Sequence, residues 1–202
     1  MKQPAVFLDK DGTLVENVPY SADPVKMRLC PGAAEGIRML GEAGFRLFVV
    51  SNQSGVARGH FGEHELVGVE ARLRTLMGQA GVKLDAFYYC PHHPEGSVAE
   101  YSLACDCRKP EPGMILNAGR DHAIDLAGSW LIGDILDDVE AGRRAGCRTI
   151  LIDNGHETEW RTSPDRTPDH VAANLIEAAE IILSASQPLS VAAVEGSTRR
   201  VR

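Results

Sequence analysis

The sequence lacks any apolar run of the roughly 18 or more residues that a transmembrane helix needs, and its first residues, MKQPAVFLDKDG, enter a predicted strand without the apolar stretch of a signal peptide. Positive charge is also scarce: 21 Lys and Arg residues oppose 28 Asp and Glu residues, for a formal net charge of −7. Such an acidic chain has no broad attraction for nucleic acid or anionic membranes. We therefore expect a cytoplasmic protein with neither kind of partner, in which phosphate binding is confined to a small basic pocket.

Internal repeats and coiled-coil heptads are absent as well. Short runs rich in β-branched and aromatic residues alternate with segments of helical period, which predicts an α/β fold with helices on both faces of a parallel sheet. We expect a doubly wound, Rossmann-like sheet of five to six strands. The predicted strands are residues 5–9, 46–51, 85–90, 129–133 and 148–153, and the predicted helices lie near 31–40, 63–79, 113–123, 137–145 and 175–183.

At 202 residues, of which 44% are hydrophobic, the chain is long enough for one well-packed domain, which we expect to span residues 1–184. Residues 185–202 are rich in small and polar side chains without periodicity, so they are predicted to form a flexible tail. The segment 154–169, which contains the letters HETEW, is predicted to be a surface excursion and has no assigned role.

The segment FLDKDGTL at residues 7–14 places Asp9 and Asp11 at the end of a predicted buried strand. Open α/β sheets bind their ligands at the ends of strands. Two carboxylates this close repel each other unless a cation or a shared proton relieves them, and Mg²⁺ is a hard cation that prefers oxygen ligands. An Asp-Gly turn after a strand is nonetheless common without any function, so this motif needs the support of others.

Two further predicted strands also end in polar residues: Ser51 lies in SNQSG, and Asp134 and Asp138 lie in GDILDD. The ends of neighbouring parallel strands meet at one edge of a sheet, so Asp9, Ser51 and Asp134 are expected to converge. Each motif alone is more often a simple turn or helix cap. For Asp138, a carboxylate at a helix start and a partner for a lysine or a metal-bound water remain alternatives.

The segment CRKP at residues 107–110 supplies a cation, because Lys109 precedes a proline on the approach to a helix. Phosphoryl transfer needs such a charge to offset the phosphate oxygens. Arg108 beside it could form a bidentate contact with a second anionic group of a substrate. A single lysine is usually a solvated surface group, so Lys109 gains importance only from the other motifs.

The motifs DKDGT, SNQSG, CRKP and GDILDD, in this order, resemble those of the haloacid-dehalogenase superfamily. The resemblance implies a phosphatase in which Asp9 is the nucleophile that becomes a transient aspartyl-phosphate, while Asp11 serves as general acid and then as general base. Both roles agree with the chemistry of carboxylates. The implied phosphate-binding residues are Ser51, Asn52 and Lys109, and the implied Mg²⁺ ligands are Asp9, Asp134 and the Asp11 carbonyl.

Three of the five cysteines crowd around two histidines, in CPHHP at residues 90–94 and CDC at 105–107. In a reducing compartment this indicates a metal site rather than disulfides. Three thiols with either His92 or His93 would suit tetrahedral zinc, and four protein ligands would make the site structural. Unpaired cysteines without a metal are the alternative. A branch of the superfamily carries a similar zinc loop, which implies the ligands Cys90, His92, Cys105 and Cys107.

Residues 5–153 resemble one branch in particular, the D-glycero-D-manno-heptose-1,7-bisphosphate 7-phosphatases, through FLDKDGT, SNQSGVARG, YYCPHHPEGSV and CDCRKPEPGM. The resemblance implies a small phosphorylated sugar as substrate: Mg²⁺-dependent removal of the 7-phosphate in the biosynthesis of activated heptose for lipopolysaccharide. Arg58 and Arg108 are the candidates for binding the other phosphate. One departure is Ile135, which stands where members often have lysine after GD.

Several alternatives remain. Histidinol-phosphate phosphatases share the zinc ligands but generally have a shorter insertion between CPH and CDC, and another small sugar phosphate is a further candidate substrate. A zinc-stabilised interaction module without catalysis is less consistent with an intact pair of aspartates, and the acidic balance argues against a nucleic-acid phosphatase. No large insertion interrupts the motifs, so we expect no separate cap domain, and we expect a monomer.

Overall fold

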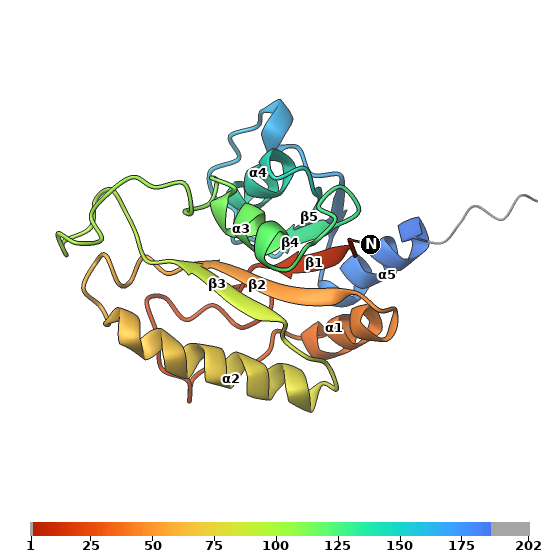
Figure 1. Ribbon diagram of the computed structural model, residues 1–202, viewed down its shortest axis with the longest axis horizontal. Coiled ribbons are helices and arrows are strands. Elements are labelled where there is room, and N and C mark those ends of the chain that lie inside the picture. The colour runs from red at the N-terminus through yellow and green to blue at the C-terminus, as the bar shows by residue number, and fades with distance from the viewer. Residues whose placement is uncertain (1, 187–202) are drawn as a thin grey trace, which may run out of the picture.

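The computed structural model describes residues 2–186 and contains one six-stranded parallel sheet with the strand order β3-β2-β1-β4-β5-β6 (Figure 1). This order places β1 in the middle, with β2 and β4 as its neighbours, so the chain reverses its direction of winding at β1. The strands are β1 (Ala5–Leu8), β2 (Arg46–Asn52), β3 (Ala86–Cys90), β4 (Trp130–Gly133), β5 (Arg148–Ile152) and β6 (His170–Ala172).

Helices cover both faces of the sheet, as the alternating sequence pattern predicts. Figure 1 shows α1 and α2 below the sheet and α3 and α4 above it. Helix α5 packs against α1 and contributes to the same apolar core. The helices are α1 (Ala33–Glu42), α2 (Leu66–Gln79), α3 (Gly113–Asp121), α4 (Leu136–Arg144) and α5 (Leu175–Ser186), and two short 3₁₀ turns cover Glu63–Glu65 and Pro164–Arg166.

The central strand β1 consists of apolar residues only, because both of its faces are buried. Val6 and Leu8 belong to the core under α1, α2 and α5, whereas Ala5 and Phe7 belong to the core under α3 and α4. All four side chains are fully buried. The polar motif that follows β1 therefore starts from a rigid position in the middle of the sheet.

The five strands predicted from the sequence are confirmed to within about one residue at each end. The additional strand β6 has three residues and lies at the edge of the sheet, where Val171 is exposed, so it lacks the apolar run that identifies a buried strand. Helix α5 continues to Ser186, beyond the predicted end at residue 183 and into the predicted tail. The rest of that predicted tail, residues 187–202, lies outside the described residues.

Residues 2–186 form this sheet and its covering helices without a separate cap domain, as expected. None of the helices in that range has the length and apolar character needed to cross a membrane.

Helix α1 approaches the start of α5 closely at Gly36, and substitution of this glycine tests the packing. A Cβ atom added at Gly36 would lie 2.4 Å from the Leu175 carbonyl oxygen, whereas one added at Gly78 in α2 would meet nothing within 4 Å. Gly36→Ala should therefore destabilise the protein by about 1–3 kcal/mol through overpacking. Gly78→Ala should stabilise it by up to about 1 kcal/mol, because alanine is the better helix former.

Urea unfolding of the two variants measures both effects. If Gly36→Ala left the free energy of unfolding unchanged or raised it, the close packing of α1 on α5 would be refuted.

Candidate functional site

The turn after β1 places two carboxylates at the edge of the sheet. The Asp9 amide donates to the Ile132 carbonyl (2.9 Å), which continues the β1–β4 pairing beyond the strand. Gly12 then adopts φ +88°, a conformation that favours glycine. A Cβ atom at Gly12 would also lie 2.1 Å from Asp134 Oδ2, so this turn needs glycine both for its backbone and for the close approach of Asp134.

Lys109 forms the centre of the site. Its ammonium is buried, with 1% of the residue exposed, and contacts Asp9 Oδ1 and Asp138 Oδ1 at 2.5 Å each and the Val50 carbonyl at 3.0 Å. Burial alone would lower the pKa of Lys109, but the two carboxylates outweigh burial and hold that pKa above its usual value. Lys109 is therefore a permanent buried cation against the candidate nucleophile.

The carboxyl group of Asp138 is both a partner of Lys109 and a carboxylate at the start of a helix, the two roles that the sequence left open. One oxygen contacts Lys109, and the other accepts a hydrogen bond from the Ile135 amide (3.3 Å) at the start of α4. A helix N-terminus favours such a carboxylate. Asp138 thus ties the first turn of α4 to the buried ammonium.

Asn52 at the end of β2 fixes the backbone of Lys109. The Asn52 side chain donates to the Lys109 carbonyl oxygen and accepts from the Lys109 amide, both at 3.0 Å. This two-bond contact joins residues 57 positions apart. The sequence predicted Asn52 near a phosphate; the structure shows its carboxamide occupied in holding the peptide that carries the lysine.

Three buried carboxylates, from Asp9, Asp134 and Asp138, offer oxygens within 4.8 Å of one another. Burial and repulsion from Asp9 raise the pKa of Asp134 to about 6, although His156 and Lys109 partly oppose this. Since Lys109 supplies only one positive charge, the group retains excess negative charge in a buried place. Oxygen ligands with an uncompensated charge of this kind fit Mg²⁺, and Asp9 and Asp134 would hold it.

Asp11 lies next to this group but has different partners. It pairs with Lys10, and its Oδ2 accepts a hydrogen bond from Gln53 Nε2 (3.2 Å). Burial raises the pKa of Asp11, and neither Lys10 nor Gln53 fully offsets that effect. The same Gln53 nitrogen donates to Ser51 Oγ at 2.7 Å, so it links Asp11 to Ser51. The candidate general acid is thereby held apart from the carboxylate that contacts Lys109.

The sequence assigned no individual role to Lys10 or Gln53, although the loop from Gln53 to Phe61 was expected to help select the substrate. Both are buried polar side chains, with 2% and 5% exposed, and both lie inside the recognised motifs DKDGT and SNQSG. A buried polar residue needs a hydrogen-bond partner. Burial of these two residues, however, depends on the packed structure and could not be read from the sequence.

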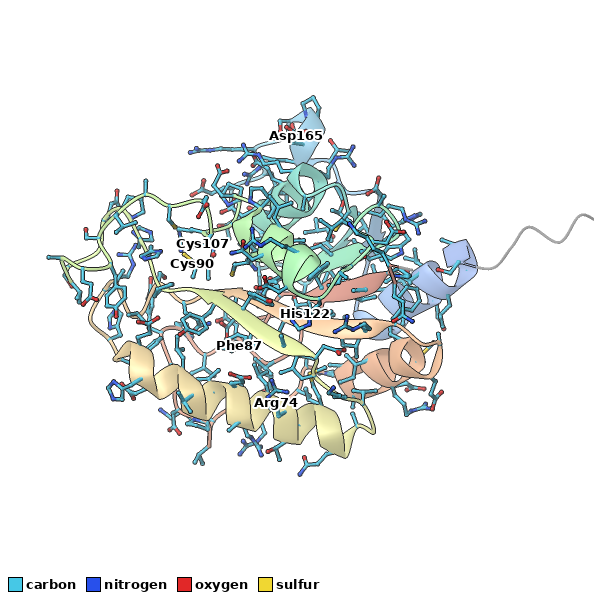
Figure 2. All side chains as sticks on the ribbon, in the orientation of Figure 1. Arg74, Phe87, Cys90, Cys107, His122 and Asp165 are labelled. Atoms are coloured by element: carbon cyan, nitrogen blue, oxygen red, sulfur yellow. The ribbon has the colours of Figure 1, made fainter. Side chains whose placement is uncertain are left out.

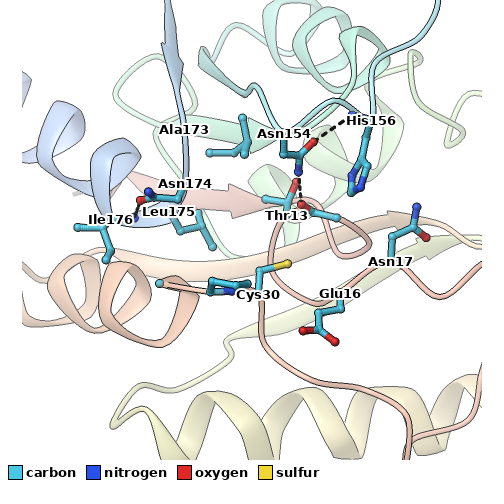
Figure 3. A pocket seen from close by; sticks show the side chains of 14 residues that line it. Thr13, Glu16, Asn17, Cys30, Asn154, His156, Ala173, Asn174, Leu175 and Ile176 are labelled. Carbon is cyan, nitrogen blue, oxygen red and sulfur yellow. Dashed lines mark hydrogen bonds between the residues drawn. The ribbon is translucent and has the colours of Figure 1, made fainter.

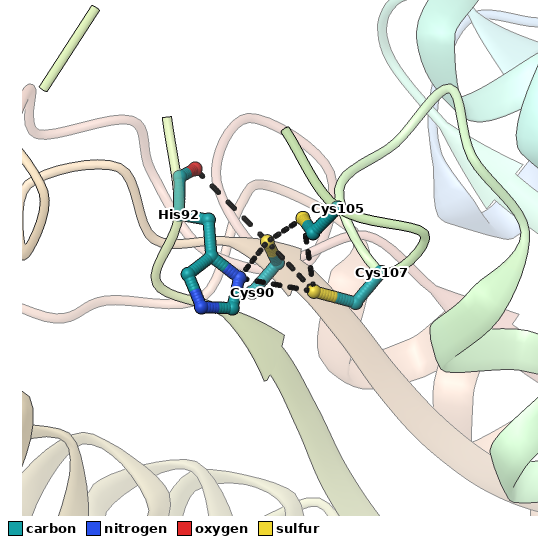
Figure 4. A group of neighbouring side chains, drawn as sticks. All are labelled: Cys90, His92, Cys105 and Cys107. Atoms are coloured by element: carbon teal, nitrogen blue, oxygen red, sulfur yellow. Dashed lines mark hydrogen bonds between the residues drawn. The ribbon is translucent and has the colours of Figure 1, made fainter. Parts of the chain in front are cut away.

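The thiols of Cys90, Cys105 and Cys107 gather with the His92 ring beyond the end of β3 (Figures 2 and 4). The Sγ–Sγ separations are 3.1, 3.2 and 3.5 Å, and His92 Nδ1 lies 3.4 Å from Cys107 Sγ and 3.7 Å from Cys90 Sγ. The edges of a tetrahedral zinc site would measure about 3.5–3.8 Å, given metal–ligand bonds of about 2.0–2.3 Å. The Sγ–Sγ separations are shorter than such edges, but the four donors are close enough to share one ion, and three thiols with one imidazole are a donor set that fits zinc.

The three cysteines of this cluster are free thiols, and the hydrogen bond shared with Cys90 lowers the pKa of Cys107 to about 5. A thiolate is the form that binds metal. His93, the other histidine that the sequence left open, lies elsewhere: its Nε2 is 3.0 Å from Arg58 Nη2.

Arg58 and Arg108 form a second, cationic group around His93. Burial, and then the charges of Arg108 and Arg58, lower the pKa of His93. Arg108 donates to the His92 carbonyl oxygen at 3.5 Å, and the Arg58 guanidinium lies 6.0 Å from the centre of the Tyr20 ring. Tyr20 in turn lines a cavity of about 290 Å³ beside Asp11. The two arginines thus lie outside the carboxylate group, and Arg58 lies near a residue that lines the cavity.

The chain is similar to known phosphatases in sequence and in fold. The family model for HAD-hydrolase-like proteins matches residues 106–178. The D-glycero-beta-D-manno-heptose-1,7-bisphosphate 7-phosphatase of Yersinia pestis is 42% identical over 153 residues, which cover 75% of this chain and 81% of that protein. The same-named protein of Photorhabdus laumondii is 40% identical over 174 residues, covering 86% and 89%.

A crystal structure of D,D-heptose 1,7-bisphosphate phosphatase from B. bronchiseptica, complexed with magnesium and phosphate, is also similar. It matches with a TM-score of 0.74 and 29% identity, and the match covers 91% of this chain and 100% of that one.

The contact between Asn52 and Lys109 leads to a prediction about stability. Asn52→Ala leaves the amide and the carbonyl of Lys109 without these partners, so it should lower the free energy of unfolding by about 1–3 kcal/mol. Asn117→Ala is the matched control, because the Asn117 side chain accepts only from the exposed Arg120 in α3. Denaturant unfolding should show a loss for Asn52→Ala that clearly exceeds that of the control; equal losses would refute the clamping role.

Proposed function

Because this chain belongs to the heptose-bisphosphate phosphatase family of haloacid-dehalogenase-like hydrolases, we propose that it removes the 7-phosphate from a D-glycero-D-manno-heptose 1,7-bisphosphate. The observation that carries the proposal is the buried contact of Lys109 with Asp9, next to the carboxylate of Asp134. The contact places the carboxylate that attacks phosphorus next to a buried positive charge. Phosphoryl transfer requires such a charge close to the nucleophile.

In the first step, an Asp9 oxygen attacks the phosphorus atom, and the bond between phosphorus and the sugar oxygen breaks. Lys109 remains charged throughout, so it stabilises the negative charge on Asp9 and on the phosphoryl oxygens. Ser51, which is 1% exposed, offers its hydroxyl at the same edge of the sheet. The product of this step is an aspartyl-phosphate, which divides one difficult hydrolysis into two easier displacements.

Asp11 supplies the proton that the departing sugar oxygen needs. Its raised pKa allows it to carry that proton closer to neutral pH than an ordinary aspartic acid can. Once ionised, Asp11 takes a proton from the water that attacks phosphorus, which releases phosphate and restores Asp9. Gln53 and Lys10 hold the Asp11 carboxyl group in place during both steps.

Mg²⁺ bound by the carboxylates of Asp9 and Asp134 and by the Asp11 carbonyl would neutralise charge on the phosphoryl group. The donor chemistry supports this assignment, since buried carboxylates in excess over the cations favour a hard divalent ion.

The sulfur-rich cluster supports a structural zinc ion bound by Cys90, His92, Cys105 and Cys107. All four ligands come from the protein, so the site has no open position for a substrate. Cys107 directly precedes Arg108 and Lys109. Zinc would therefore fix the segment that delivers the two cations, and its effect on catalysis would be indirect.

The cationic group around His93 supports binding of the second phosphate. A bisphosphate brings a dianion that the Asp9 site cannot accommodate together with the reacting phosphoryl group. Arg58 and Arg108 both lie near His93, and Arg58 faces Tyr20, which lines a cavity that borders Asp11. A primary phosphate at the end of the sugar chain can reach Asp9, while the ring-bound phosphate remains near the arginines.

Substitution of the nucleophile tests the proposed chemistry. Asp9→Asn keeps the shape of the side chain but removes its nucleophilicity and charge, so turnover of the bisphosphate should fall by far more than tenfold. A loss of less than about tenfold, or about 1.4 kcal/mol of barrier, would contradict the nucleophile assignment. The assay should include both heptose bisphosphate anomers and histidinol phosphate, and more efficient turnover of histidinol phosphate would refute the heptose assignment alone.

Elemental analysis tests the zinc site. Protein purified without chelator should contain about one zinc per chain, and Cys107→Ser should lose most of it. Cys30→Ser is the matched control, because Cys30 is half-buried and lies outside the cluster. Protein that contains no zinc, or an equal zinc content in both variants, would contradict the assignment.

Replacement of Arg108 tests the second-phosphate site. A charge-assisted contact contributes about 1.5–3 kcal/mol, so Arg108→Ala should raise KM for the bisphosphate by about ten- to a hundredfold. A simple monophosphate should be hydrolysed almost as well as by the parent enzyme. Arg38→Ala, on the exposed face of α1, serves as the control. Equal losses for monophosphate and bisphosphate would show that Arg108 does not bind the second phosphate.

A further inference from the structure

The segment after β5, which the sequence left without a role, contacts the candidate metal site through two polar side chains. Asn154 Nδ2 donates to the Gly12 carbonyl oxygen at 2.7 Å, and His156 Nδ1 lies 2.6 Å from Asp134 Oδ2. Figure 3 shows Asn154 and His156 beside Thr13 of the turn after β1. The HETEW segment therefore begins at the site and is not merely a surface excursion.

The backbone that carries His156 is fixed on both sides. The His156 amide donates to Asn154 Oδ1 at 3.2 Å, and the next residue, Glu157, accepts a hydrogen bond from the Leu136 amide at 2.6 Å. Leu136 is the first residue of α4, directly after the loop that contains Asp134. These contacts join the turn after β1, the loop after β4 and the segment after β5 around one carboxylate.

Both oxygens of Asp134 have a neighbour that can donate a hydrogen bond. Thr13 Oγ1 lies 3.4 Å from Oδ1, and His156 faces Oδ2. Ile135, directly after Asp134, supplies no side-chain donor. The donor that faces Oδ2 comes from the segment after β5.

We propose that His156 is a positioning residue for Asp134, which it orients by donating a hydrogen bond from Nδ1 to Oδ2. This inference rests on the proposed function, in which Asp134 is a ligand of Mg²⁺. A neutral imidazole that donates from Nδ1 adds no charge at the metal site, so it restricts rotation of the carboxylate without competing with the cation. Mutation of such a hydrogen-bond partner of a metal ligand typically lowers metal affinity by about 10–100-fold.

Because His156 is partly exposed, its substitution can test its effect on Asp134 without unfolding the protein. Its side chain is 39% exposed, and it lines an existing cavity of about 600 Å³ together with Thr13 and Asn17. Truncation would enlarge an open cavity and would not create a void in the apolar core. A large loss of stability is therefore not expected from His156→Ala.

Calorimetric titration of the zinc-loaded protein with Mg²⁺, without substrate, tests the proposal. His156→Ala and His156→Gln should bind Mg²⁺ about 10–100-fold more weakly than the parent protein. His156→Asn should retain most of the affinity, because its amide nitrogen stands at the same place along the side chain as Nδ1, whereas that of glutamine lies one bond further out. Glu159→Gln is the control, since Glu159 lies in the same segment and only pairs with exposed Arg161.

Three results would overturn the proposal. Mg²⁺ affinity of His156→Ala within about threefold of the parent would show that Asp134 needs no such partner. Equal losses in the Ala, Gln and Asn variants would show that the ring acts only by filling space. Absence of Mg²⁺ binding by the parent protein would refute the metal assignment itself, and thus the proposed mechanism as well.

Discussion

One buried ammonium group determines the arrangement of this site. Lys109 is almost completely removed from solvent and has two carboxylates, Asp9 and Asp138, at 2.5 Å. An unpaired ammonium in such a place costs several kcal/mol, so the ends of β1 and the start of α4 must lie where these carboxylates can reach it. The pairing does not neutralise the site, because Asp134 adds further negative charge. The negative charge that Lys109 does not balance favours binding of a divalent cation. A purely structural ion pair would carry no such excess of negative charge.

The position of Lys109 depends on elements far apart in the sequence. Asn52 at the end of β2 binds both polar groups of its peptide, and the cysteine cluster ends two residues before it. The sheet order brings β2, β1 and β4 side by side, so that their polar ends meet. Zinc, if bound as proposed, stabilises the loop that leads to Lys109, which explains how a metal with no open coordination position can still influence catalysis.

Much of the fold and site could be predicted from the sequence, because strand period, apolar runs and four short motifs are local features. Asp9, Ser51 and Asp134 were predicted to converge from their places at strand ends; the structure groups Asp9 with Asp134 and links Ser51 to Asp11 through Gln53. Lys109 was assigned to the site through its motif, and it contacts Asp9. The partners that hold these residues were missed. Gln53, Lys10 and His156 act through contacts that only the packed chain creates, and His156 lies in a segment without strand or helix period. Strand β6 was missed for a related reason, since a three-residue edge strand buries little apolar surface.

The most direct test of the account is to identify the residue that becomes phosphorylated. Enzyme quenched with acid during turnover of the bisphosphate can be treated with borohydride, which reduces an acyl phosphate to an alcohol but leaves free carboxylates unchanged. Peptide mass spectrometry then locates the reduced side chain. The arrangement around Lys109 predicts reduction at Asp9 alone, in the peptide that contains FLDKDGTL. Reduction at Asp11 or Asp134, or no reduced carboxylate in enzyme that is turning over, would contradict the assignment of Asp9 as the nucleophile.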